Sequence, residues 1–316
     1  MKLLKVGYFA DGPWSHKALQ ALLDTGVIEI VFIVPRFDAQ DPVLKDYANQ
    51  LSVPFLPHAD VNDDDFIQEL RDYSADLFIS MSFNQILRKQ IIATAPLGFI
   101  NCHAGALPFY RGRNPLNWVL INDENQFGVT VHYVDEGIDT GDIICQHMVA
   151  IHESDDYASL LKKAFDKCSE VLVEAVELIV ENKVQAIKQS DIDPYGFYCG
   201  MRRPGDEIID WNLPARRIHN LIRAITFPGP CARTALDGDE LAVVSSRFLA
   251  GAPNYICTPG EVVGRDHNGI LVKTADSVIQ IHLMAKVSSK GEIGSATTPK
   301  HRIGTRFGGK VTRSKS

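Results

Sequence analysis

The densest group of residues able to do chemistry lies between Asn101 and Asp142. Asn101 and His103 end a predicted strand two residues apart, so their side chains point to the same side of that strand. Asp139 follows in the glycine-rich turn 137–141, between two predicted hairpin arms. One amide, one imidazole and one carboxylate could therefore meet at a single edge of a sheet.

These three residue types suit acyl transfer to an amine. An imidazole such as His103 can take a proton from the attacking nitrogen. A carboxylate such as Asp139 can orient the ring and stabilise its charged form, while the Asn101 amide can donate to the oxyanion of a tetrahedral intermediate. No nucleophilic Ser or Cys is required, and Cys102 alternates to the opposite side, as a small core residue would. By spacing alone, the same residues also fit ordinary capping and turn positions.

The elements that must position these side chains alternate between strands and helices. Apolar periodicity predicts strands at 3–10, 27–34, 53–56, 76–81 and 98–103, separated by helices at 15–25, 41–50, 63–73 and 87–95. This pattern predicts an α/β fold with a Rossmann-like, mostly parallel sheet, which binds ligands beyond the carboxyl ends of its strands. The first strand leads into Asp11-Gly12-Pro13 rather than GxGxxG, which argues against a dinucleotide site.

The rest of the chain predicts a second domain. Hairpin arms at 127–134 and 143–151 precede a long helix at 155–182, after which prolines, glycines and aromatics gather. We expect a catalytic domain, a junction, a small β-rich domain and a basic tail, with bounds 1–188, 189–213, 214–285 and 286–316. The last segment has eight Lys or Arg against one Glu, which is typical of a flexible tail. A basic arm that contacts a polyanion is the alternative.

Composition excludes several classes of protein. The 316 residues are 45% hydrophobic and 22% charged, unlike collagen-like or wholly disordered chains. The net charge of 32 − 39 = −7 disfavours broad contact with nucleic acid. The apolar run 27–34 is strand-length and is interrupted by Glu29, and the N-terminus resembles a buried strand rather than a signal peptide, so we expect no membrane segment. Six cysteines without a CxxC pair indicate reduced thiols, a cytoplasmic protein and no metal site.

Two long segments carry a family resemblance. NCHAGALPFYRGRNPLNWVLIND, followed by GVTVHYVDEGIDTGDII, resembles the signature of the folate-dependent formyltransferases, which take a one-carbon unit from 10-formyltetrahydrofolate. RRPGDEIIDW, IHNLIRAITFPGP and PGEVV resemble that family's second domain, so the resemblance covers residues 3–285. The FYRGRNPLNW form is more similar to the nucleotide-sugar N-formyltransferases than to the transfer-RNA enzyme.

The resemblance implies that Asn101, His103 and Asp139 are the catalytic trio. It also implies that a strand-exit loop and a facing loop hold the pterin ring of the folate through Met81, Phe83, Asn84, Ile86, Leu87, Asp139 and Asp142. A pterin is flat and carries donors and acceptors on its edge, so fixed backbone groups can bind it without further ordering. For Phe83, a plain core aromatic is the alternative.

The acceptor implied by the resemblance is the amine of an amino-deoxy sugar linked to dTDP or GDP. Its product would serve surface-glycan assembly, such as lipopolysaccharide O-antigen, and many relatives are dimers. Acidic and aromatic side chains would hold the sugar, arginines the diphosphate and a tyrosine the base. The candidates for these contacts are Asp11, Trp14, Arg111, Arg113, Tyr198, Arg202 and Arg203.

Three other functions remain open at this point. A methionyl-tRNA formyltransferase shares the donor, the trio and the two-domain plan, but needs extensive Lys and Arg contacts along RNA. A non-catalytic folate- or nucleotide-binding module would not need the three catalytic residue types that the trio provides. A dinucleotide-dependent dehydrogenase fits the parallel sheet but lacks the glycine fingerprint, and fold alone does not decide among these.

Overall fold

The computed structural model describes residues 3–309, and it divides into two compact units. Unit 1 contains the chain up to Pro115 together with Gln126–Ala150 and Lys162–Gly200. Unit 2 contains Leu116–Asn125, Ile151–Leu161 and the chain from Met201 onward. The chain therefore passes between the units several times, where we had expected consecutive domains.

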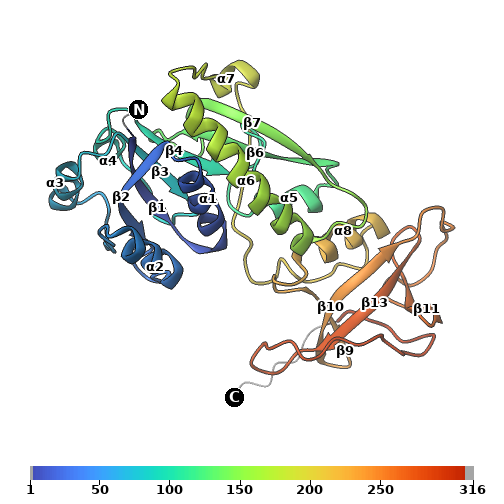
Figure 1. Cartoon of the computed structure of the whole chain (residues 1–316). Helices are drawn as coiled ribbons and strands as arrows, with labels where there is room; N and C mark the ends of the chain where they lie inside the picture. Colours follow the sequence, from blue (N-terminus) through green and yellow to red (C-terminus); the bar gives the residue numbers. More distant parts are fainter. Residues whose placement is uncertain (1–2, 310–316) are drawn as a thin grey trace. The chain divides into compact units, whose positions relative to one another are not determined.

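Unit 1 is built on a six-stranded sheet with the order β2-β1-β3-β4-β6-β7 (Figure 1). The first four of these strands are parallel, whereas β6 and β7 run antiparallel to their neighbours. The bounds are β1 (Leu4–Ala10), β2 (Ile28–Pro35), β3 (Leu77–Met81), β4 (Phe99–His103), β6 (Gln126–Tyr133) and β7 (Ile143–Ala150). The predicted α/β class with a mostly parallel sheet is confirmed.

Two helices of unit 1, α2 and α3, begin at capping aspartates. Asp41 accepts hydrogen bonds from two backbone N–H groups in the first turn of α2, and Asp63 does the same for α3. Helices α1 and α6 lie side by side, joined by the Trp14–Phe165 ring contact and by an ion pair between Lys17 and Asp166. The bounds are α1 (Gly12–Asp24), α2 (Pro42–Leu51), α3 (Asp64–Asp72), α4 (Lys89–Ile92), α6 (Tyr157–Val180) and α7 (Gln189–Ile192).

An aromatic cluster fixes the central strands against one another. The Phe9 ring lies 4.9 Å from that of Phe99 and 5.3 Å from that of Phe78, and all three side chains are buried. Tilted and edge-on rings of this kind add to the stability that their buried area already provides. A Cβ on Gly7 would lie 2.2 Å from the Phe32 ring, so glycine is needed where the cluster meets β1.

The register between β4 and β6 decides which side chains meet at the site. Asn101 pairs with His132, and His103 pairs with Thr130. Cys102 points to the other side of β4, where its Sγ lies 3.7 Å from the Cys168 carbonyl oxygen on α6. The prediction that Cys102 is a core residue facing away from Asn101 and His103 is confirmed.

Unit 2 contains a five-stranded antiparallel sheet with the order β11-β12-β13-β10-β9, and α8 packs on β10. Asn117 of α5 donates to the Ala224 carbonyl of α8 at 2.6 Å, which joins residues distant in sequence. The bounds are α5 (Pro115–Ile121), α8 (Ala215–Ile225), β9 (Ala232–Leu236), β10 (Asp239–Phe248), β11 (Val262–Asp266), β12 (Gly269–Lys273) and β13 (Val278–Lys286).

The structure differs from the predicted flexible tail at 286–316. Within the described part, Val287 pairs with Ile293, and the Phe307 ring stacks on Trp211 with centroids 6.0 Å apart. A few apolar side chains thus hold a segment whose average composition is polar, and residues 310–316 lie outside the described residues. The predicted junction at 189–213 is divided as well, because its residues up to Gly200 belong to unit 1.

No helix in the described part of the chain is both long and apolar enough to cross a bilayer.

Candidate active site

His103 ends β4 and is held by a backbone carbonyl. Its Nε2 lies 2.7 Å from the Tyr110 carbonyl oxygen, and its side chain is buried. A carbonyl only accepts, so Nε2 carries the hydrogen, and Nδ1 of the neutral ring has a free lone pair. Nδ1 lies 3.6 Å from Asp139 Oδ2. The proton-accepting atom of the ring therefore faces a carboxylate.

A glycine makes this arrangement possible. A Cβ on Gly105 would lie 2.6 Å from His103 Nε2 and 2.7 Å from the Tyr110 oxygen, which is closer than real Cβ atoms approach other atoms. Tyr110 itself has a left-handed backbone, with φ of 56°, which places its carbonyl over the ring. The Asn-Cys-His-Ala-Gly segment thus contains both the imidazole and the gap that admits its partner.

Asp139 is held as a charged carboxylate. The Gly112 N–H donates to its Oδ2 at 2.8 Å. Burial alone raises the pKa of Asp139, but His103, His132 and the Gly112 N–H outweigh burial and hold the pKa well below its ordinary value. A Cβ on Gly141 would lie 1.9 Å from the Tyr133 oxygen, so glycine is required where this turn closes.

Asn101 meets His132, a residue for which the sequence analysis predicted no role. Asn101 Nδ2 lies 3.3 Å from His132 Nε2, and His132 Nδ1 donates to the Tyr133 carbonyl at 2.7 Å. His132 Nε2 also lies 3.5 Å from Asp139 Oδ1. The signal that could have found His132 is its place on the polar side of β6, opposite Asn101.

The structure brings the predicted trio together, but the role expected of Asp139 changes. We expected Asp139 to orient the His103 ring, but at 3.6 Å the carboxylate is too far for a hydrogen bond, and the Tyr110 carbonyl at 2.7 Å orients the ring instead. Asp139 is placed to stabilise a positive charge on the ring. Within residues 3–309, no group of three or more His, Cys, Asp or Glu side chains is arranged to hold a metal ion.

The loop after β3 is held from several sides. Arg36 Nη2 donates to the Ser82 carbonyl at 2.7 Å. Gln85 accepts from the Val61 N–H at 2.9 Å and donates to the His58 carbonyl at 2.8 Å. These bonds fix the shape of the loop whose backbone groups were predicted to hold a pterin.

Two residues expected to contact the pterin have core-facing side chains. Met81 is buried at the end of β3, and Phe83 packs edge-on against Phe9 at 5.6 Å. The core alternative for the Phe83 side chain is therefore correct, because the ring extends the aromatic cluster. The Met81 side chain is therefore closed to a ligand, whereas the Phe83 ring is only partly buried.

The other predicted folate residues lie at a surface hollow or near it. The Asn84 amide donates to Asp38 at 3.2 Å, and the Asp142 carbonyl accepts from the Tyr133 N–H. Ile86 is 68% exposed. A hollow of about 370 Å³ is lined by two of the predicted residues, Ile86 and Leu87, together with Arg88, Lys89, Gln90 and Glu136.

Asp11 and Trp14 have partners of their own. Asp11 Oδ2 lies 3.3 Å from Arg36 Nε, and burial raises the Asp11 pKa despite this neighbour. Trp14 lies in the first turn of α1 rather than on a loop, and its ring packs edge-on against Phe165 with centroids 4.6 Å apart. The Trp14 ring therefore packs on α6.

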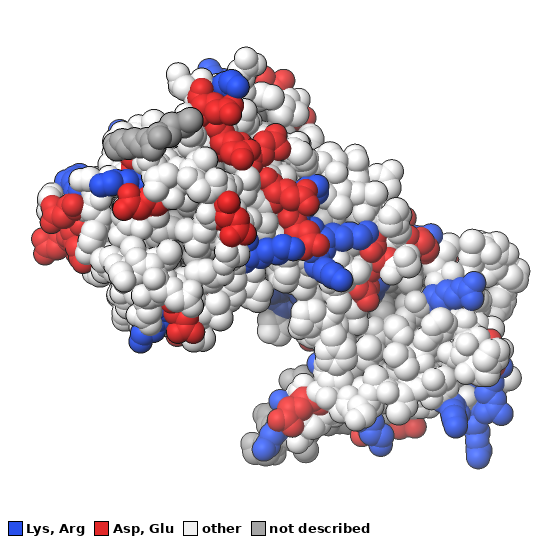
Figure 2. All heavy atoms as spheres, in the orientation of Figure 1, with Lys and Arg blue, Asp and Glu red and all other residues white. Residues whose placement is uncertain are grey.

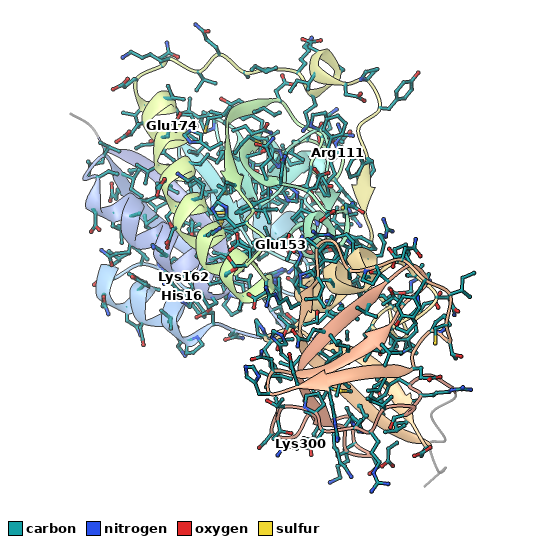
Figure 3. All side chains as sticks on the ribbon, turned by 90° about the vertical axis from the view of Figure 1, so that its right-hand side faces the viewer. His16, Arg111, Glu153, Lys162, Glu174 and Lys300 are labelled. Atoms are coloured by element: carbon teal, nitrogen blue, oxygen red, sulfur yellow. The ribbon has the colours of Figure 1, made fainter. Side chains whose placement is uncertain are left out.

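The structure contradicts the prediction that Arg111 binds a diphosphate. Arg111, labelled in Figure 3, is buried, and its Nε and Nη2 donate to Gln189 Oε1 at 3.0 and 2.7 Å. Arg113 is exposed. Tyr198 is exposed too, and the central carbon of the Arg111 guanidinium lies 5.4 Å from the centroid of the Tyr198 ring. A buried guanidinium with an amide acceptor has no free edge for a phosphate.

Arg202 and Arg203 belong to unit 2, whereas the trio belongs to unit 1. Arg202 Nε is buried without a hydrogen-bond partner, and Arg203 is exposed.

Several known proteins resemble this chain in sequence. Methionyl-tRNA formyltransferase of Desulforamulus reducens is 30% identical over 88% of this chain and 89% of its own length. Methionyl-tRNA formyltransferase of Pelobacter propionicus is 33% identical over 82% of this chain and 84% of its own length.

Solved structures share the fold. A sugar 3-N-formyltransferase crystallised in the presence of dTDP and 5-N-formyl-THF has a TM-score of 0.65 at 22% identity, covering 91% of this chain and 99% of that one. An N-formyltransferase from Helicobacter canadensis, with folinic acid and dTDP-3-aminofucose, has a TM-score of 0.66 at 19% identity, covering 89% and 99%.

Residues 6–176 match the formyl transferase family, and residues 202–295 match the C-terminal domain of formyl transferases. The first match spans most of unit 1, including the trio. The chain belongs to the formyltransferase family.

Proposed function

We propose that the chain transfers the formyl group of 10-formyltetrahydrofolate to the amine of an amino-deoxy sugar carried on a nucleoside diphosphate. The observation that carries formyl transfer is that Asp139 lies 3.6 Å from His103 and 3.5 Å from His132, which in turn contacts Asn101. These residues supply a proton acceptor, a stabilising charge and an amide donor, which formyl transfer to an amine requires.

Each residue of the trio has a separate task. His103 Nδ1 takes the proton from the amine as it attacks the formyl carbon, and returns it to the leaving nitrogen of the folate. Asp139 stabilises the imidazolium between these two steps. Asn101 presents an N–H to the developing oxyanion, while its other N–H is directed to His132. No covalent enzyme intermediate is needed.

The loop after β3, whose residues Ile86 and Leu87 line the hollow, is the candidate binding site for the donor. A flat ring system with polar edges binds best to backbone donors and acceptors that are already fixed in place. The loop after β3 offers such groups, because Arg36 and Gln85 hold it by hydrogen bonds. Rigid backbone groups lose little freedom on binding, so their contacts are not offset by the entropy of ordering a loop.

Charge favours a small acceptor over an RNA. The chain has a net charge of −7. Figure 2 shows acidic side chains over α6, where Asp166, Glu170, Glu174 and Glu177 follow one another at helical spacing. A net negative charge disfavours broad contact with an RNA backbone, whereas a nucleotide sugar presents only two phosphates.

Methionyl-tRNA is the second candidate acceptor, because relatives 30% and 33% identical to this chain carry that activity in their names. Unit 2 offers the basic residues that such a substrate would need. They include Arg265, Lys286, Lys290, Lys300, Arg302 and Arg306, several of which are exposed.

A panel of acceptors tests the proposal. The purified chain and 10-formyltetrahydrofolate are incubated with dTDP- and GDP-linked 3- and 4-amino sugars and with initiator methionyl-tRNA, and mass spectrometry detects added formyl groups. Formylation of a nucleotide sugar supports the proposal, whereas formylation of the tRNA alone contradicts it. His147→Ala is the matched control for His103→Ala, because His147 pairs with Glu174 on the surface, away from the trio.

A further inference from the structure

Two residues of the segment 110–112 contact the catalytic trio through their backbone groups. The Tyr110 carbonyl accepts from His103 at 2.7 Å, and the Gly112 N–H donates to Asp139 at 2.8 Å. Between them, the Arg111 side chain turns away from the trio and reaches Gln189. The segment 110–112 therefore sets the positions of His103 and Asp139, and Arg111 anchors that segment.

Gln189 joins this segment to the loop that carries Asp139. Its Nε2 donates to the Asp139 carbonyl at 2.9 Å and to the Gly141 carbonyl at 2.8 Å. Its Oε1 accepts two bonds from Arg111, and only 3% of the residue is exposed. Two carbonyls require the NH₂ group and a guanidinium requires the oxygen, so the amide has only one orientation that satisfies all four bonds.

We propose that Gln189 is a positioning residue for formyl transfer, which holds the Asp139 loop and Arg111 in the one arrangement that places Asp139 beside His103. The proposal depends on the proposed function only through the roles of His103 and Asp139. Gln189 does not touch the reacting atoms. It acts through the backbone of Asp139 and through Arg111.

The segment that follows Gln189 strengthens the anchor. Strand β5 (Arg111–Gly112) pairs in parallel with β8 (Tyr198–Cys199), and the Arg111 N–H donates to the Phe197 carbonyl at 3.2 Å. A Cβ on Gly196 would lie 2.5 Å from the Pro108 carbonyl, so these two stretches are in close contact. Residues 189–199, expected as part of a domain junction, are thus built into the support of the active site.

The test uses two variants of Gln189 and one matched control. Gln189→Met keeps the length of the side chain and removes every hydrogen bond. Gln189→Glu keeps the acceptor for Arg111 but replaces both donors to the loop with carboxylate oxygens. Gln280→Met is the control, because Gln280 is also a buried glutamine, with bonds of 3.0 Å to both oxygens of Asp266 in unit 2.

Both Gln189 variants should lose about 10- to 100-fold in kcat, with the KM of each substrate unchanged, since a displacement of about 1 Å at reacting groups has effects of that size. The control should keep the parental kcat even if its Tm falls. Gln189→Glu is also crystallised, and its His103 Nδ1–Asp139 Oδ2 distance should exceed the parental 3.6 Å.

The results separate this inference from the proposed function. If the parent chain formylates no acceptor in the panel, the proposed function fails, and the crystal structure alone decides the role of Gln189. A parental kcat in Gln189→Glu, or an Asp139 loop that stays in place, would overturn the inference. A rise in KM at unchanged kcat would also overturn it, because Gln189 would then act on binding.

Discussion

Gly105→Ala is the substitution whose effect follows most directly from the coordinates. The added Cβ would lie 2.6 Å from His103 Nε2 and 2.7 Å from the Tyr110 oxygen, whereas ordinary contacts begin at 3.4 Å. The ring must then retreat by 3.4 − 2.6 = 0.8 Å and the carbonyl by 3.4 − 2.7 = 0.7 Å. Gly105 does not have a positive φ, so the effect is steric rather than one of backbone strain.

These displacements predict two measurable losses. Weakening the 2.7 Å hydrogen bond in a buried site costs about 1–3 kcal/mol of folding free energy. Moving His103 Nδ1 by a similar distance from the reacting carbon lowers kcat by about 100-fold. Thermal unfolding measures the first loss, and formyl transfer followed by mass spectrometry measures the second.

Gly200→Ala is the control, because Gly200 lacks a positive φ and has no atom within 4 Å of its ideal Cβ. It should behave as the parent in both assays. A Gly105→Ala variant with parental kcat would refute the claim that the Tyr110 carbonyl must hold the ring for catalysis.

The other predictions concern charge and the folate loop. Because the pKa of Asp139 is held below its ordinary value, its stabilising contribution is complete above the unfolded pKa of about 3.9 and is lost as pH falls through the lower folded pKa. Asp139→Asn should therefore show a smaller loss of Tm below about pH 4 than the parent. Its kcat should be lower by about 10- to 10³-fold at pH 7, because an opposite charge beside a titrating group shifts the pKa of that group by about 1–3 units. Arg36→Met should raise the KM for 10-formyltetrahydrofolate about tenfold in steady-state kinetics and leave the acceptor KM unchanged, since the Ser82 carbonyl loses its donor. Burial lowers the pKa of His219 to about 4. The contribution of the neutral His219 to the stability of unit 2 should therefore be fully present above about pH 6.5 and be lost as pH falls toward 4. Urea titrations at pH 7 and pH 5 measure this decline, and an equal decline in His219→Asn would contradict the prediction.

The sheet could be predicted from the sequence because its signals are local, whereas the trio was predicted from the family resemblance. Asn101 and His103 are adjacent on one strand, and the glycines around Asp139 mark a tight turn. Period-two and helical patterns in the first hundred residues identify the four parallel strands of the sheet. The predicted strand at 53–56 is wrong, because that segment forms only an isolated bridge between Ile33 and Phe55. What these patterns lack is any information about which distant segments meet.

The role of Arg111 could not be predicted for that reason. Its type and its place in a glycine loop favour a phosphate contact, but Gln189, 78 residues later, accepts from its guanidinium. His132 was missed because its role depends on the β4–β6 register. The tail was misjudged because composition averages over a few anchoring side chains such as Phe307.

The central claim is that His103 is the proton acceptor in formyl transfer. It is tested most directly by measuring kcat for formyl transfer and the Kd for 10-formyltetrahydrofolate in His103→Ala. The account predicts that kcat falls by at least about 10²- to 10⁴-fold, while the Kd for the folate stays close to that of the parent. A His103→Ala variant that keeps near-parental turnover would contradict the account.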